Sequence, residues 1–275
     1  MLFKQTAIGP MPLKNRFIRS ATHEGLADEN GYPTEKLLRK YEMLAKNDVA
    51  CIITGYAGVA QNGKTNAHNM LMITDDDAIE SYKRITDKIH EYGTSIVLQV
   101  AHCGRQTRAA VTGLPTVAPS ALKDKMFSET VPHELSELEI YELIDSFVSA
   151  IVRAQKAGFD GVQLHVGHGY LLAQFLSSYT NRRNDRWGGT TENKFRIVRE
   201  IIEKAQAKVG NYPILVKMNA YDGRKNGMRV PESVEIAQML ETAGCAAVEI
   251  SCGVAEDGLS SVRGEKLPLD AVFLS

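Results

Sequence analysis

Short runs of almost uninterrupted apolar residues recur along the chain, between longer segments of mixed polarity. Three of these runs read TSIVLQVAH, FDGVQLH and YPILVKMNA. Strands that are buried on both faces have this continuous apolar pattern, and a sheet of such strands is typically parallel. We therefore predict strands near residues 16–22, 50–56, 95–101, 160–165, 213–218 and 246–252.

Amphipathic segments with helical spacing lie between these runs. In residues 136–157, apolar side chains recur every three or four positions after Ser136 and Glu139, which have the spacing of a capping box. Residues 191–209 repeat the pattern and stop at Gly210, a residue type that often ends helices. The pattern predicts helices near residues 34–46, 76–92, 136–157, 191–209 and 231–243.

The alternation of strands and helices favours an α/β fold, either a TIM-type (β/α)8 barrel or a doubly wound sheet. No GxGxxG turn follows the first strand, which counts against the dinucleotide-binding form of the second fold. We predict one barrel domain over residues 1–275 with about six βα units. Only 23 residues follow Cys252 and one unit takes roughly 30, so this barrel is expected to be truncated before strands 7 and 8. The long connection over residues 103–135 is expected to be a substrate loop.

The composition is that of an ordinary globular protein, with 44% hydrophobic residues, 24% charged residues and a net charge of −1. This balance gives no reason to expect binding to nucleic acid or to an anionic membrane surface. No apolar run approaches ~18 residues and no signal-peptide core is evident, so we expect a cytoplasmic protein. The cysteines are widely spaced, which argues against a disulfide framework and against a metal site made from them.

The most distinctive stretch is HVGHGY, residues 165–170, directly after an apolar run. It places His165, His168 and Tyr170 at the end of a strand, where parallel α/β proteins bind ligands. Two imidazoles can donate to one carbonyl oxygen, and a phenol can supply a proton. The histidine pair also suggests a metal, but no third ligand lies close in sequence, so we predict no metal site.

Several longer segments resemble one known family. They are LKNRFIRSAT, LQVAHCGRQT, VAPSAL, AGFDGVQLHVGHGYLLAQFLSSYTNRRNDRWGGTTENKFR, ILVKMNAYD and VEIS, in this order. Together they resemble the Old Yellow Enzyme family of FMN-dependent NAD(P)H:flavin oxidoreductases, in particular the branch that includes 2,4-dienoyl-CoA reductase. The resemblance extends from about residue 2 to about residue 255 and is most specific over residues 157–196.

The resemblance implies an FMN that lies across the barrel mouth. Small residues at the end of the first strand would let the backbone approach a flat ring, and a cation near the flavin N1–O2 edge would stabilise the reduced flavin. His23 stands where many relatives carry cysteine or threonine. The positions that match flavin contacts are Ser20, Ala21, Thr22, Gly55, Gln99 and Lys217.

The resemblance also implies the reaction. NADH or NADPH would reduce the flavin, and a small α,β-unsaturated carbonyl compound would then be reduced. His165 and His168 would hold its carbonyl oxygen, and Tyr170 would donate the proton. Longer relatives carry iron–sulfur cysteines and a second nucleotide-binding domain beyond this part, so an iron–sulfur cluster is expected only if the native chain is longer.

Two other interpretations remain open. The chain could be a non-catalytic, truncated barrel that binds a ligand or partner weakly. A metal-dependent barrel hydrolase is a third class, and the missing third ligand argues against it. Because an open barrel leaves two strand edges unpaired, we also expect a homo-oligomer.

Overall fold

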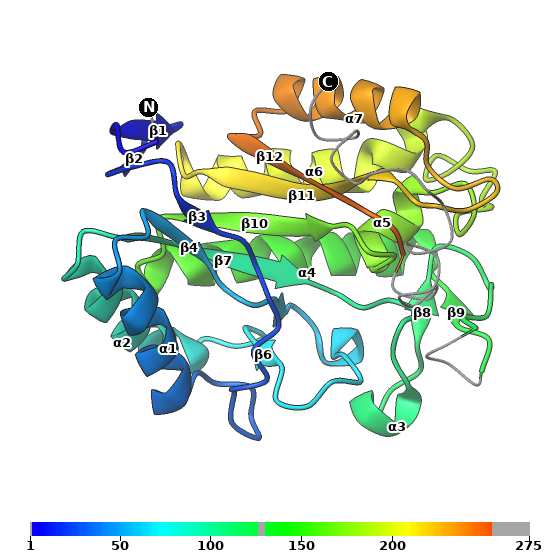
Figure 1. The fold of residues 1–275 in the computed structure, drawn as a ribbon. Coiled ribbons are helices and arrows are strands. Elements are labelled where there is room, and N and C mark those ends of the chain that lie inside the picture. The colour runs from blue at the N-terminus through cyan, green and yellow to red at the C-terminus, as the bar shows by residue number, and fades with distance from the viewer. Residues whose placement is uncertain (1, 126–129, 255–275) are drawn as a thin grey trace.

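The computed structural model describes residues 2–125 and 130–254, which form a curved parallel sheet with helices on its outer side (Figure 1). Six strands lie side by side in chain order, and every neighbouring pair is parallel. They are β3 (Ile18–Arg19), β4 (Cys51–Ile53), β7 (Ser95–Ala101), β10 (Gly161–Val166), β11 (Ile214–Tyr221) and β12 (Ala247–Cys252). The six predicted strands and their barrel-type parallel arrangement are confirmed.

The five predicted helices are also present, with their ends shifted by a few residues at most. In α4, the Ser136 hydroxyl accepts from the Glu139 N–H and the Glu139 carboxylate accepts from the Ser136 N–H, so the capping box is confirmed. Gly210 ends α6 with a positive φ of 65°. The helices are α1 (Glu35–Lys46), α2 (Ala78–His90), α4 (Glu137–Lys156), α6 (Thr191–Val209) and α7 (Val230–Thr242).

Neighbouring residues on each strand face opposite sides of the sheet. On β10, Val162 and Leu164 belong to the large apolar core shared with the outer helices. Gln163 lies between them and therefore faces the barrel interior. Across the sheet, Gln163 is paired in register with Gln99, and Lys217 with Glu249. The alternation thus gathers polar side chains from four strands inside the barrel.

A hairpin of β1 (Thr6–Ile8) and β2 (Met11–Leu13) precedes the first barrel strand and was not predicted. Met11 and Leu13 pack with Cys51, Ile53 and Val97 in a second apolar cluster. Cys51 begins β4, so the hairpin lies at the amino-terminal ends of the barrel strands (Figure 1). The opposite, carboxyl-terminal ends are left for the loops that form a site.

Several short elements lie in those loops and were also not predicted. The long connection between β7 and α4 contains α3 (Ala109–Thr112) and a pair of strands, β8 (Val117–Ala118) and β9 (His133–Glu134). The connection after β4 contains β5 (Ala57–Gly58), η1 (Gln61–Gly63) and β6 (Leu71–Met72), and α5 (Leu171–Leu176) follows β10. With two to six residues each, they are too short to show a periodicity.

The two outer strands of the sheet are less covered than the central ones. The side chain of Ile18 beside β4 is 42% exposed and that of Val248 on β12 is 36% exposed. The homo-oligomer expected from such edges stays a prediction, as does the truncation before strands 7 and 8, because residues 255–275 lie outside the described residues. All four cysteines are free, and none of the helices described is long and apolar enough to cross a membrane.

Candidate active site

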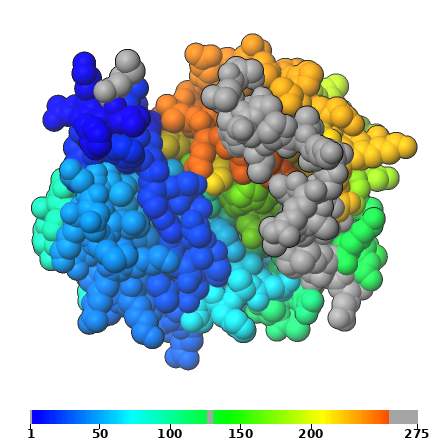
Figure 2. Space-filling model, in the orientation of Figure 1, coloured from blue at the N-terminus to red at the C-terminus, as the bar shows by residue number. Residues whose placement is uncertain are grey.

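A cavity of about 180 Å³ opens at the carboxyl-terminal ends of the barrel strands. Figure 2 shows a hollow between the blue amino-terminal segment and the orange segment of β12 and α7, with green atoms at its floor. The cavity is lined by Ala21, His23, Tyr56, Gln99, His165, His168, Tyr170 and Lys217. Most of the site residues predicted from the sequence therefore meet at one place.

His165 lies near the end of β10 and is buried against two other rings. Its ring centroid is 5.0 Å from that of His168 and 4.9 Å from that of Tyr170, both in edge-to-face geometry. Burial, and then the charges of His168 and Lys217, lower the pKa of His165 well below its usual range. Its Nδ1 atom is buried and has no hydrogen-bond partner among residues 2–125 and 130–254. His165 is therefore a neutral imidazole with one ring nitrogen left for a ligand.

His168 follows the strand and has a φ of 58°, which is unfavourable for a residue with a side chain. Its backbone N–H donates to Asn219 Oδ1 at 3.1 Å, and its Nε2 lies 2.7 Å from Ser251 Oγ. Both contacts hold the ring toward the cavity from strands β11 and β12. Burial and then the charge of Lys217 lower the pKa of His168 to about 4, so this imidazole is also neutral at pH 7.

Tyr170 completes an aromatic group with Tyr56 and His23. The Tyr170 hydroxyl donates to the Tyr56 hydroxyl at 3.4 Å, and burial raises the pKa of Tyr170 well above its usual value. The Tyr56 ring stacks on His23 at 5.0 Å and on His165 at 6.2 Å. We call His23, Tyr56, His165, His168 and Tyr170 the imidazole wall. Desolvation holds its members His165, His168 and Tyr170 in their neutral forms.

The rest of the cavity lining belongs to a polar and charged group of side chains. Lys217 Nζ lies 2.8 Å from Glu249 Oε1 and donates to Ser20 Oγ at 2.9 Å. Gln163 Nε2 donates to Glu249 Oε2 at 2.9 Å, and Gln99 Nε2 donates to Gln163 Oε1 at 2.6 Å. We call Ser20, Gln99, Gln163, Lys217 and Glu249 the lysine network.

The carboxyl group of Glu249 is ionised in this network. Burial alone raises its pKa, but hydrogen bonds from Lys217, Ser20 and Gln163 outweigh that effect, and the pKa is lowered. The negative charge of Glu249 thus compensates the positive charge of Lys217. The charges of the network compensate one another, whereas the imidazole wall contains a buried ring nitrogen, His165 Nδ1, that has no partner among the described residues.

Three of the predicted flavin contacts lie outside the cavity lining. Ser20 belongs to the lysine network, and Thr22 and Gly55 lie nearby. A Cβ atom on Gly55 would be 2.7 Å from the Thr22 carbonyl oxygen and would clash with the Glu24 carboxylate. This contact within the chain is sufficient reason for the glycine, so a flavin contact at Gly55 stays a prediction.

Three site residues were missed by the sequence analysis, namely Tyr56, Gln163 and Glu249. Tyr56 follows a strand of only three residues, and its stacking partners come from distant segments. Gln163 and Glu249 sit in strands that were predicted, at positions two residues before His165 and opposite Lys217. Strand alternation gave a signal for Gln163, but only the strand register identifies Glu249 as the partner of Lys217.

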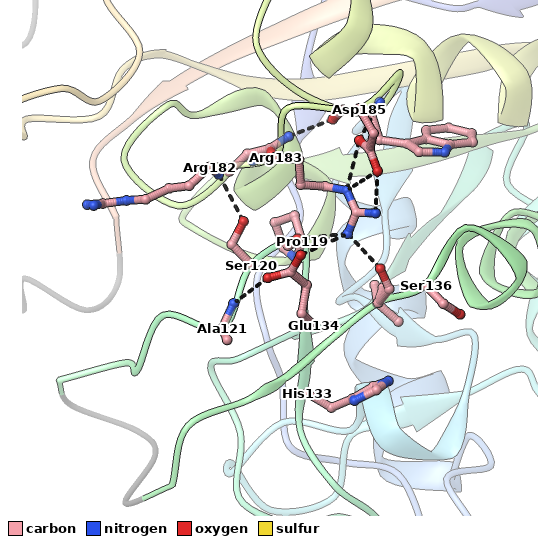
Figure 3. Close-up of polar contacts among 12 residues, drawn as sticks. Pro119, Ser120, Ala121, His133, Glu134, Ser136, Arg182, Arg183 and Asp185 are labelled. Atoms are coloured by element: carbon pink, nitrogen blue, oxygen red, sulfur yellow. Dashed lines mark hydrogen bonds and ion pairs between the residues drawn. The ribbon is translucent and has the colours of Figure 1, made fainter.

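The polar loop over residues 181–189 binds the segment around β8 and β9. The Arg183 guanidinium donates to the carbonyl oxygens of Pro119 at 3.0 Å and Leu135 at 2.6 Å, and it pairs with Asp185 (Figure 3). The Arg182 N–H donates to Ser120 Oγ at 2.9 Å. The loop therefore connects the β8–β9 segment to the end of α5.

The described residues contain no group of three histidine, cysteine, aspartate or glutamate side chains arranged to hold a metal ion. The site as described consists of hydrogen-bonding and aromatic groups.

The chain matches known proteins over almost its whole length. It is 37% identical to the NADH oxidase of Thermoanaerobacter brockii over 257 residues, which are 93% of this chain and 39% of that protein. The structure resembles that of 2-naphthoyl-CoA reductase in complex with 2-naphthoyl-CoA, with a TM-score of 0.89 at 27% identity over 93% of this chain and 41% of the other. The chain thus spans about two fifths of the length of both proteins.

A shorter relative matches as well. The old yellow enzyme homologue from Zymomonas mobilis superimposes with a TM-score of 0.83 at 28% identity, over 92% of this chain and 74% of that one. Residues 1–254 match the model of one protein family. The protein is accordingly a member of the NADH:flavin oxidoreductase / NADH oxidase family, to which the Old Yellow Enzyme resemblance pointed.

Proposed function

We propose that this protein is an FMN-dependent oxidoreductase that uses NADH or NADPH to reduce an α,β-unsaturated carbonyl compound. The observation that carries the proposal is the composition of the cavity, which brings neutral imidazoles and a phenol together with an amide and a lysine. Such a cavity offers donors to a carbonyl oxygen and to a polar heterocycle. Membership of the flavin oxidoreductase family supports this interpretation.

The lysine network has a donor set that fits the flavin pyrimidine. Gln99 lines the cavity and uses its Nε2 for Gln163, so its Oε1 is left to accept from a ring N–H. Lys217 also lines the cavity, and two of its three donors are used by Ser20 and Glu249. Ala21 adds a small side chain that permits close approach of a flat ring. When bound, FMN would supply the redox chemistry by accepting a hydride from the nicotinamide and passing one to the acceptor.

The histidines are neutral at physiological pH, so each carries one ring N–H, which would donate to the acceptor's carbonyl oxygen. If the Ser251 hydroxyl donates to His168 Nε2, the ring proton of His168 lies on Nδ1, and this N–H can donate to a ligand. The unpaired Nδ1 of His165 provides a second ring nitrogen at the same place. Two such donors polarise a carbonyl group and stabilise negative charge that develops on its oxygen.

Tyr170 is the candidate general acid. A raised pKa keeps the phenol protonated at every pH in which the protein is expected to work, as a proton donor requires. Its ring contacts His165, so the donor lies beside the group that would hold the carbonyl oxygen. Tyr170 would protonate the carbon next to the carbonyl group.

The test begins with the purified protein. It should be yellow, and denaturation should release FMN noncovalently. With NADH or NADPH under anaerobic conditions, the bound flavin should bleach, and 2-cyclohexenone should restore its colour and be converted to cyclohexanone. Release of FAD, a covalent flavin, or bleaching that no enone reverses would each contradict the proposal.

A further inference from the structure

A second and larger cavity, of about 690 Å³, lies between the segment after α5 and the start of α7. Its lining includes Ser178 and Arg182 from the first segment, and Asn226, Gly227 and Arg229 from the second. The two segments follow the barrel strands β10 and β11 (Figure 1). The cavity that they line therefore lies at the carboxyl-terminal ends of the strands, as the imidazole wall does. The function proposed above does not use it.

Two arginines give this cavity a positive charge. Arg182 is exposed. Its guanidinium makes one long hydrogen bond, from Nε to the Tyr179 carbonyl oxygen at 3.4 Å. Figure 3 shows its side chain extending away from the other residues drawn. Arg229 is also exposed, with its guanidinium 5.9 Å from the centre of the Tyr221 ring. Neither arginine pairs with a carboxylate anywhere in residues 2–125 and 130–254.

The one acidic residue in the lining does not cancel this charge. The Glu232 carboxylate is bound by the ammonium group of Lys194, which is 3% exposed and also donates to Ser178 Oγ at 2.9 Å. A further arginine, Arg224, is fixed close by, because it donates to the Tyr179 hydroxyl at 2.9 Å and stacks on that ring at 4.8 Å. The cavity is therefore cationic, roomy and built partly on fixed groups.

Its position relative to the first cavity indicates the shape of the ligand. Tyr170 immediately precedes α5, and Ser178 follows two residues after that helix ends. A helix of six residues rises about 9 Å, so Tyr170 of the first cavity and Ser178 of the second flank the two ends of one short helix. A ligand with an extended shape can reach both.

We propose that the second cavity binds the terminal phosphate of a nucleotide-bearing ligand whose reactive end enters the first cavity. This proposal rests on the proposed function, because the proposed function assigns the first cavity to the hydride donor or to the hydride acceptor. Arginine recognises phosphate through paired N–H donors, and a phosphomonoester carries up to two negative charges to match Arg182 and Arg229. Two ligand types share this chemistry, a 2′-phosphorylated pyridine nucleotide and an acyl thioester of a 3′-phosphorylated nucleotide.

The test measures binding of 2′,5′-ADP, 3′,5′-ADP and adenosine by calorimetry at one fixed salt concentration. At least one of the two bisphosphates should bind, adenosine should not, and the preferred isomer tells which ligand type is used. Arg182→Gln and Arg229→Gln should each weaken binding about tenfold or more, because each removes charge-assisted hydrogen bonds. Arg16→Gln is the matched control, since Arg16 is an exposed arginine before β3, at the other end of the strands. It should change nothing.

Absence of binding to either bisphosphate, or equal weakening in Arg16→Gln, would overturn the proposal. A second assay separates this failure from that of the proposed function. Neither NADH nor 2-cyclohexenone carries the 2′- or 3′-phosphate that the second cavity is proposed to bind, so Arg182→Gln and Arg229→Gln should leave the reduction of 2-cyclohexenone by NADH unchanged. If those variants lose this activity too, the arginines are structural and the phosphate site is refuted. If the wild-type protein binds the bisphosphate but reduces no enone, only the proposed function fails.

Discussion

The imidazole wall and the lysine network line the same cavity but differ in charge. The wall consists of neutral side chains, whereas the network contains a pair of opposite charges. In the wall, burial keeps His165, His168 and Tyr170 neutral, and one ring nitrogen of His165 has no partner within the described chain. In the network, Lys217 and Glu249 keep their charges because they satisfy one another. Burial of a polar group without a partner costs free energy, whereas a hydrogen-bonded pair recovers most of that cost. The wall is therefore the part of the site that gains most from a ligand.

The largest effect that tests this comparison is expected from Tyr170→Phe. The change removes the phenol proton and keeps the ring that packs on His165 and Tyr56. General acid catalysis is typically worth ~10²–10⁴ in rate, so reoxidation of the reduced flavin by an enone should slow by that factor. Stopped-flow measurement should show flavin reduction by NADH unchanged. Equal slowing of both half-reactions would show that Tyr170 is structural.

The second test uses pH, because the neutral histidines of the wall should make the folded protein less stable in acid. The pKa of His168 is about 4 in the folded protein and 6.5 is its ordinary value, so the unfolded chain takes up the proton first. Stability is therefore lost as the pH falls from about 6.5 toward 4, by about 3 kcal/mol for this residue. His165 and His102, whose pKa values are also lowered by burial, act in the same direction.

Urea unfolding at pH 7 and pH 4.5 checks this prediction. His168→Gln should lose part of the pH dependence and keep the rest. The control is His68→Gln at an exposed position outside the wall, and it should keep all of it. An unchanged pH dependence in His168→Gln would mean that this imidazole is not held neutral by its surroundings.

The third test is directed at the lysine network. Glu249→Gln leaves the side chain's shape but removes the charge that compensates Lys217, so the unfolding free energy should fall by about 2 kcal/mol. The same change leaves a net positive charge near any bound flavin, which should raise the flavin reduction potential. A double-mutant cycle with Lys217→Met isolates the pair. Additive effects of the two changes would show that the residues do not depend on each other.

The two regions also differ in how far the sequence alone revealed them. His165, His168 and Tyr170 follow one predicted strand within six residues, so a local motif was enough to place them together. Tyr56 was missed because the rings that it stacks on, those of His23 and His165, come from segments far away in sequence. In the lysine network, Lys217 stood out as a cation in an apolar run, but Glu249 becomes its partner only through the register of β11 and β12.

The fold shows the same division between local and distant information. The barrel strands and long helices were predicted within a few residues because their apolar patterns extend over many positions. The β1–β2 hairpin and the short loop elements were missed, since their stability comes from packing partners such as Cys51 and Val97 rather than from periodicity. At Gly55, where the resemblance implied a flavin contact, the structure shows Thr22 and Glu24 close to the position of a Cβ atom, and the flavin contact stays a prediction.

The smallest effect expected within the wall is that of Tyr56→Phe. The Tyr56 and Tyr170 hydroxyls are 3.4 Å apart, beyond the 2.7–2.8 Å that is usual for such a pair, so this hydrogen bond contributes little. The ring itself stacks on His23 and His165, and phenylalanine preserves that stacking. The unfolding free energy should change by less than about 1 kcal/mol and enone reduction by less than about fivefold. Tyr56→Ala should cost far more stability, since it removes the ring. If Tyr56→Phe instead slowed enone reduction as much as Tyr170→Phe does, the proton would reach the substrate through both phenols, and the wall would be a proton relay rather than a set of independent neutral donors.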